Sequence, residues 1–292
     1  MMRRSNGSFS VSRRRILMDK LMSILVYAAV CLASVPLILI LAEAVIQGFP
    51  VLSPSFLLNA PVPVGFPGGG IGPDIEGTLV MVGIASLISV PLGVGAGIFF
   101  SEWPESKISF LSSFSNDVLA EFPSMVVGIF VYTIVVLTTG RFSAFAGAVA
   151  LSIIMVPIVA RTTEESLKVV PKTLREASMA LGVSRWKTIV RVVMSTGKGG
   201  LITGILLAVA RAAGETAPLI LTAGYSTAFL NGLFNPSGSL SYLIYYYGIS
   251  PYTSWHAIAW GAALILIVIM LTIIVSVKLI FRNKFEETRA EI

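Results

Sequence analysis

Long apolar stretches recur along the 292-residue chain, and each lacks the alternation of polar and apolar positions that a membrane β-barrel strand shows. A helix needs about 20 apolar residues to cross a hydrocarbon core about 30 Å thick. Six stretches reach or approach that length, at residues 22–46, 78–100, 118–139, 143–160, 199–222 and 257–280. The pattern predicts an all-α polytopic membrane protein with six transmembrane helices.

Composition supports a membrane protein. The chain is 55% hydrophobic and 12% charged, with a mean hydropathy of +0.87, which leaves too little polar surface to cover a soluble globule. Its net charge of +6 is spread over the segments that flank the predicted spans, so no nucleic-acid partner is expected. Cys31 is the only cysteine and lies inside the first span, which excludes an internal disulfide and a cysteine-rich metal site.

The positive charges predict an orientation. Nineteen of the 21 Lys and Arg residues flank the spans on one face, whereas Arg141 falls on the other face and Arg211 inside a span. The loops from Gln47 to Glu76 and from Ala223 to His256 contain no Lys or Arg. The positive-inside rule therefore places the basic face, with both termini, in the cytoplasm.

These features divide the chain into successive segments. A basic cytoplasmic arm at 1–21 precedes the first transmembrane helix at 22–47 and an irregular, proline-rich extracytoplasmic loop at 48–77. A core at 78–280 and a cytoplasmic tail at 281–292 follow. Within the core, the cytoplasmic segment 161–198 is rich in helix-forming residues and is interrupted by Pro171 and Gly182. This pattern predicts two short helices joined by a glycine turn, in a segment that serves as a docking element.

Glu176, Ala177 and Ser178, followed by Gly182, resemble the EAA motif of ABC importer permeases. In that family the motif begins a coupling helix that lies in a groove of the ATPase subunit. Small side chains permit a close approach, an acidic residue near a helix start is favoured by the helix dipole, and glycine adopts a left-handed turn without strain. The family usually continues to an Ile-x-Leu-Pro ending, whereas this chain has Val192 to Ser195 there and no proline.

Three further segments narrow the resemblance. With the segment that contains the motif, they make four segments that resemble, in this order, the A-type permease subunits of bacterial phosphate import systems. The four are GGGIGPDIEGTL (68–79), FPSMVVGIFVY (122–132), VPIVARTTEESLKVVPKTLREASMALG (156–182) and ARAAGETAPLILTAG (210–224). The resemblance implies a type I ABC importer permease fold in a prokaryotic inner membrane, without a cofactor. It also implies three kinds of partner: a homologous sister permease, a cytoplasmic ATPase dimer and an extracytoplasmic phosphate-binding protein.

Arg211 and Glu215 are charged residues inside the predicted fifth span. An arginine at a helix centre disfavours membrane insertion by roughly 2.5–3.5 kcal/mol. Counted from Gly199 at about 1.5 Å per residue, Arg211 lies about 18 Å into the span, and its i, i+4 spacing from Glu215 favours an ion pair. Gly200, Gly204 and Ala208 form a ridge of small residues expected to pack on another helix and to lead to the two charges.

Two interpretations of this pair remain open. In one, the planar fork of Arg211 contacts phosphate in transit while Glu215 balances its charge when the anion is absent. In the other, the pair only locks the span to a neighbouring helix.

No phosphate-binding loop of the Walker type, zinc motif or plausible catalytic triad occurs in the sequence. We therefore expect a non-catalytic subunit that works by alternating access while a partner ATPase hydrolyses ATP. Two alternatives are a permease for another oxyanion, such as phosphonate, sulfate or molybdate, and an ion-coupled secondary carrier for an anion.

Overall fold

The computed structural model describes residues 13–66 and 68–290, and every regular element in these ranges is helical. This confirms the predicted all-α class. Three short elements are a 3-10 turn, Phe49–Val51, and two π-helical segments, Tyr132–Val136 and Ile189–Val193. The α-helices are α1 (Arg13–Gly48), α2 (Pro54–Leu58), α3 (Gly72–Glu102), α4 (Lys107–Ala120), α5 (Ser124–Val131), α6 (Leu137–Thr139), α7 (Ala144–Lys168), α8 (Lys172–Ala180), α9 (Arg185–Thr188), α10 (Met194–Ala213), α11 (Ala217–Thr222), α12 (Leu240–Gly248) and α13 (Thr253–Ala290).

Five continuous helical stretches in the described part of the chain are long and apolar enough to cross a membrane, and a bent pair makes a sixth. The pair consists of 107–120 and 124–139, whose axes differ by 102°. A continuous third span at 118–139 was therefore a wrong prediction. Pro123 explains the break, because it has no backbone N–H and restricts the residue before it.

Helix α7 is the centre of the bundle and packs along α3 on one side and α10 on another. The face of α3 toward α7 carries small, buried residues four positions apart: Ala85, Ser89, Gly93 and Gly97. A Cβ atom on Gly97 would lie 2.4 Å from the carbonyl oxygen of Ala160 and 2.5 Å from the Cβ of Thr163. The two backbones approach this closely because no side chain separates them.

Several predicted boundaries shift. Helix α1 begins at Arg13, so residues 13–21 of the predicted arm are helical, while residues 1–12 lie outside the described residues. The predicted irregular loop 48–77 contains a 3-10 turn and α2, and α3 begins at Gly72. Ser53 caps α2, because its Oγ accepts a hydrogen bond from the Phe56 N–H at 3.1 Å. The predicted tail is helical as far as Ala290, and residues 291–292 lie outside the described residues.

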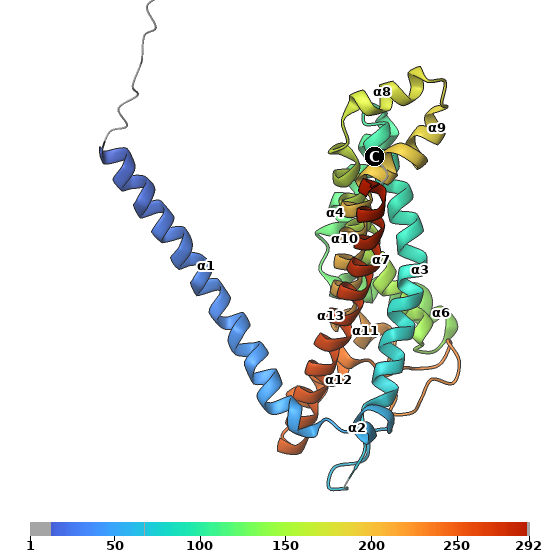
Figure 1. Cartoon of the computed structure of the whole chain (residues 1–292). Coiled ribbons are helices and arrows are strands. Elements are labelled where there is room, and N and C mark those ends of the chain that lie inside the picture. Colours follow the sequence, from blue (N-terminus) through green and yellow to red (C-terminus); the bar gives the residue numbers. More distant parts are fainter. Residues whose placement is uncertain (1–12, 67, 291–292) are drawn as a thin grey trace, which may run out of the picture.

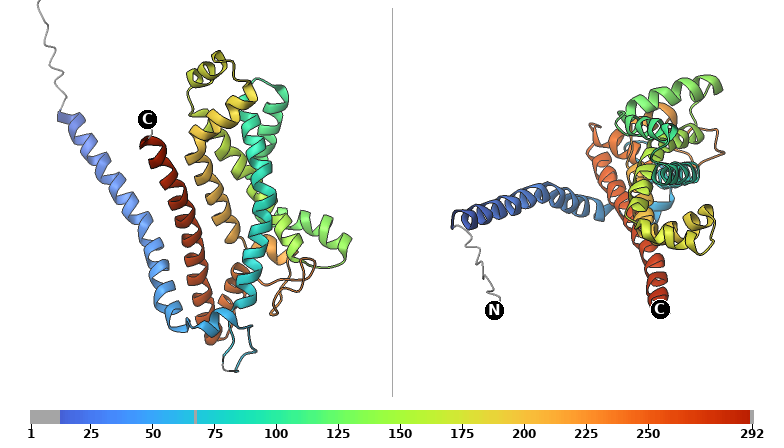
Figure 2. Two further views of the ribbon diagram at one scale, coloured as in Figure 1. Left: turned by 45° about the vertical axis from the view of Figure 1, so that its right-hand side comes forward. Right: turned by 90° about the horizontal axis from the view of Figure 1, so that it is seen from above.

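The bundle has two unlike ends (Figure 1). Helices α8 and α9 lie at one end, here named the α8 end, together with the start of α1 and the end of α13. Helix α2 and the junction of α12 with α13 lie at the opposite end. Helix α1 leans away from the bundle and meets α13 near its own C-terminus, where Gly48 lies against the carbonyl group of Trp260. Figure 2 also shows that α10 ends well short of the opposite end.

Candidate functional site

The segment at the α8 end is shorter than predicted. Helix α7 continues to Lys168, and the helix that leads into α10 already begins at Arg185, so the predicted bounds 161 and 198 both fall inside long helices. The two helices expected on either side of Gly182 are present as α8 and α9. Helix α9 is the first turn of a long helix, since it continues through a π-helical segment into α10.

Gly182 makes the predicted turn. Its φ is +80°, in the left-handed region that glycine adopts without strain. The Gly182 N–H donates to the Met179 carbonyl at 2.9 Å, and the Val183 N–H donates to the Ser178 carbonyl at 3.3 Å. These two hydrogen bonds are those of a Schellman motif, which ends α8 and reverses the chain.

The other motif residues lie on α8. Ser178 is buried and shares a 2.9 Å hydrogen bond with the Thr188 hydroxyl, whereas Glu176 and Ala177 are exposed. Glu176 is the fifth of nine residues in α8, beyond the first turn, so the helix-dipole argument for it was wrong. Leu181 is 85% exposed just after this helix. The outer surface of α8 therefore combines an acidic side chain, a small side chain and an open apolar one.

Arg175, for which no role was predicted, ties α8 to two other helices. Its Nε and Nη2 atoms both lie 3.0 Å from Oε1 of Glu102, at the end of α3. Its guanidinium also donates to the carbonyl of Leu167 in the last turn of α7, at 2.8 Å, and to that of Val170 just after this helix. The two side chains are only 16% and 6% exposed, so the ion pair is largely shielded from water.

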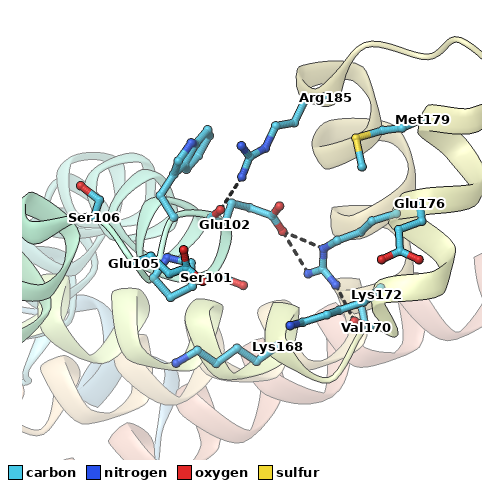
Figure 3. A pocket seen from close by; sticks show the side chains of 13 residues that line it. Ser101, Glu102, Glu105, Ser106, Lys168, Val170, Lys172, Glu176, Met179 and Arg185 are labelled. Atoms are coloured by element: carbon cyan, nitrogen blue, oxygen red, sulfur yellow. Dashed lines mark hydrogen bonds and ion pairs between the residues drawn. The ribbon is translucent and has the colours of Figure 1, made fainter.

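Arg185 contacts the same end of α3. Its guanidinium donates to the backbone carbonyl of Glu102 and lies over the Trp103 ring, 4.6 Å from the centroid. Both arginines therefore contact Glu102, and Figure 3 shows Arg185 pointing toward it. A cavity of about 590 Å³ separates the end of α3 from α8 at this place. Two features of the sequence point to these contacts: an acidic residue at the end of a long apolar span, and arginines on both sides of the motif.

Arg211 and Glu215 form the predicted ion pair, with 3.7 Å between Nε and Oε1. Arg211 lies in the last turn of α10, and Glu215 lies in the break between α10 and α11. A continuous span at 199–222 was therefore a wrong prediction. Pro218 carries no N–H and Gly214 is a poor helix former, so both favour the break.

The predicted ridge of small residues packs on α7. A Cβ on Gly200 would meet the Ser166 side chain, and one on Gly204 would meet Thr162. Arg211 is seven residues after Gly204 and three after Ala208, so it follows the same stripe of α10. In the single chain its side chain is 58% exposed, while that of Glu215 is 16% exposed.

The break itself has polar partners. The Ser241 hydroxyl of α12 donates to the Glu215 carbonyl at 2.8 Å. The Thr216 hydroxyl donates to the Ser241 carbonyl at 3.4 Å. Backbone groups freed by a helix break need such partners inside a membrane protein. Helix α12 therefore stabilises the break beside Arg211.

A multi-pass helical bundle with a small helical segment at one end and a broken, charged helix inside it defines the chain as a membrane permease of the type I ABC importer fold. It belongs to the family of binding-protein-dependent transport system inner membrane components, whose pattern it matches over residues 89–284. The multi-pass inner-membrane character predicted from the apolar stretches is confirmed.

Several curated relatives are described as phosphate transport system permease proteins. The phosphate transport system permease protein PstA of Xylella fastidiosa (strain 9a5c) is 43% identical over 74% of this chain and 76% of its own length. The protein of that name from Haemophilus influenzae is 39% identical over 91% of this chain and 94% of its own length. An inward-facing structure of the MetNI methionine ABC transporter matches 72% of this chain and 94% of its own chain, with a TM-score of 0.61 and 18% identity. The last similarity concerns the fold alone.

Proposed function

We propose that this chain is one permease subunit of an ATP-driven importer of inorganic phosphate. In this proposal it forms half of the translocation pathway together with a homologous sister permease. An extracytoplasmic binding protein delivers phosphate, and a cytoplasmic ATPase dimer supplies the driving force while this subunit carries out no catalysis. The α8 end then faces the cytoplasm, with both termini on that side. The names of the relatives support the choice of phosphate.

The observation that carries the proposal is the exposed Arg211 at a helix break. Its ion pair with Glu215 is long, so most of its guanidinium donors remain available to an anion. Lipid contact would cost a central arginine roughly 2.5–3.5 kcal/mol. The exposed side chain therefore needs water or protein beside it, and a pathway shared with a sister permease supplies both.

Glu215 balances the charge of Arg211 when no anion is bound. A tetrahedral oxyanion accepts two hydrogen bonds from the planar guanidinium fork, and a lysine offers only a point charge. An anion held by arginine alone would be released slowly, whereas a neighbouring carboxylate competes for the same donors. The arrangement thus suits transient contact during alternating access between two states.

Helix α8 supplies the docking surface for the ATPase. Its exposed Glu176 and Ala177 lie beside the open side chain of Leu181, outside the apolar bundle. Exposed apolar groups next to polar ones mark contact surfaces for another protein. In the proposal, closure of the ATPase dimer moves α8, and the pathway switches its opening from one side to the other.

The test is uptake of radiolabelled phosphate by proteoliposomes that contain this chain, its sister permease, the ATPase and the binding protein. Arg211→Ala should lower ATP-driven uptake at least about tenfold, because a charge-assisted hydrogen bond contributes about 1.5–3 kcal/mol. Arg211→Lys should give an intermediate rate. Arg141→Ala, which removes an exposed arginine of the loop before α7, is the matched control and should transport normally.

Each other outcome has a definite meaning. Normal uptake by an assembled Arg211→Ala complex would show that the pair only locks helices together. Stronger uptake of sulfate, molybdate or phosphonate than of phosphate would identify an importer for another oxyanion. Uptake by the chain alone, driven by an ion gradient without ATP, would identify a secondary carrier.

A further inference from the structure

The motif helix α8 is held mainly by polar contacts. Ser178 is its one buried residue, and the apolar cluster below it is built from α3, α7 and the segment before α10. That cluster contains Ile98, Leu167, Val170, Ile189 and Val193. Close apolar packing therefore fixes the neighbours of α8 to one another but does not fix α8 to them.

Across the cavity, the end of α3 is joined to the motif segment at two points. Arg175, directly before Glu176, binds the Glu102 carboxylate, and Arg185, three residues after Gly182, binds the Glu102 carbonyl. We name these three residues the α3 clamp. Because both arginines flank the motif, the clamp fixes the position and the direction of α8 relative to α3 (Figure 3).

Helix α3 reaches from the clamp to the opposite end of the bundle. It is a 31-residue helix, and near its start the Glu76 carboxylate accepts a hydrogen bond from the Leu230 N–H at 3.0 Å. Leu230 belongs to the loop between α11 and α12, in which Ala228 is exposed. A displacement of the clamped end of α3 would therefore move this loop.

We infer that the Glu102–Arg175 pair is the joint through which movement of α8 reaches α3 and, through it, the loop at the opposite end. Both are positioning residues, since neither is expected to touch ATP or the transported anion. The inference depends on the proposed function in requiring an ATPase that moves α8, but it does not depend on which anion is carried.

The pair has the chemistry of a joint. Arg175 binds one carboxylate and two backbone carbonyls at once, which its rigid fork of donors permits. A lysine retains the charge, but its donors radiate from a single nitrogen and cannot reproduce contacts that three separate guanidinium nitrogens make. Removing the Glu102 side chain instead leaves the largely buried guanidinium without its counter-charge and removes the direct link from α8 to α3, while the contact of Arg185 with the backbone carbonyl of residue 102 remains.

The first measurement is stimulation of ATPase activity by the loaded binding protein in the reconstituted complex. Glu102→Ala and Arg175→Lys should each lower this stimulation by at least about fivefold, the lower end of typical coupling between sites. The ATPase should still co-purify with both variants. Glu165→Ala is the matched control, because Glu165 forms an exposed ion pair with Arg161 at 3.1 Å near the same end of α7. It should leave the stimulation unchanged.

The second measurement follows movement directly and needs no transported substrate. With Cys31→Ser as background and cysteine-free partner subunits, Ala228→Cys is labelled with a membrane-impermeant maleimide, with and without a non-hydrolysable ATP analogue. The analogue should change the labelling rate in the otherwise unaltered complex and in the Glu165→Ala variant. It should not change the rate in the two clamp variants.

Wild-type stimulation together with a wild-type change in labelling in both clamp variants would overturn the inference. If Glu102→Ala fails to assemble, Arg175→Lys decides alone, because it keeps the charge of the native side chain. A complex that shows the labelling change but imports no phosphate would refute the proposed substrate and leave the clamp standing. Loss of the change only in the clamp variants supports the inference whatever the anion.

Discussion

The contact between α3 and α7 can be tested with two glycines on the same helix. Gly97 lies against α7, where an added Cβ would meet the Ala160 carbonyl oxygen at 2.4 Å and the Thr163 Cβ at 2.5 Å. Gly95 has nothing within 4 Å of the corresponding position. Gly97→Ala and Gly95→Ala therefore add the same methyl group to the same helix, the first in a tight contact with α7 and the second in open space.

The expected difference in the free energy of unfolding between the two variants follows from these surroundings. Alanine is favoured over glycine inside a helix by about 1 kcal/mol, and this gain is common to both variants. Overpacking at a tight contact costs about 1–3 kcal/mol. One of the atoms that Gly97→Ala meets is a backbone oxygen, which cannot rotate away as a side chain can. Gly97→Ala should thus be less stable than Gly95→Ala by about 1–3 kcal/mol, or roughly 5- to 150-fold in the unfolding equilibrium.

Unfolding of the purified chain in mixed micelles, titrated with SDS and followed by tryptophan fluorescence, measures this difference. Trp103 directly follows α3 and is well placed to report its separation from α7. Gly95→Ala should match or exceed the stability of the unaltered chain. Equal stability of the two variants would refute the close approach of α3 and α7 and, with it, the central position of α7.

Two further predictions concern the motif segment. Ala177→Trp should abolish co-purification of the ATPase while leaving the unfolding midpoint of the chain unchanged, because Ala177 is exposed on α8; intact binding would place the docking surface elsewhere. Gly182→Ala should lower the stability of the turn by about 1–2 kcal/mol, the cost of a left-handed residue with a side chain. Proteolysis of the 169–184 segment should accelerate accordingly, and an unchanged cleavage rate would show that the positive φ is not required.

Much of the fold could be predicted because a bilayer makes hydrophobic length decisive. A stretch such as 78–100 has few alternatives to a spanning helix, and the structure places α3 over it. The glycine turn was predictable for a similar local reason, since Gly182 follows a helix-forming stretch and favours a left-handed conformation. In both cases the deciding interaction lies within a few residues along the chain.

Two of the misses involve interactions with residues elsewhere in the chain. The apolar stretch continues through Gly214 and Pro218, so the predicted fifth span included both residues. The hydroxyl group that binds the Glu215 carbonyl at the break comes from Ser241 on another helix. The clamp was missed because Glu102 and Arg175 are 73 positions apart. No local pattern identifies such a pair, although Glu102 ends a long apolar span and Arg175 directly precedes the motif.

Two hydrogen bonds connect α3 to the helix break beside Arg211. The Thr78 hydroxyl of α3 accepts from the Leu240 N–H at 2.8 Å, and the next residue, Ser241, donates to the Glu215 carbonyl at 2.8 Å. Both side chains are buried, so these bonds are protected from competing water. A movement of α3 that carries α12 with it must shift Glu215, whose contact with Arg211 is already long. The same α3 movement that the clamp transmits would then set how strongly Glu215 competes with an anion for the guanidinium.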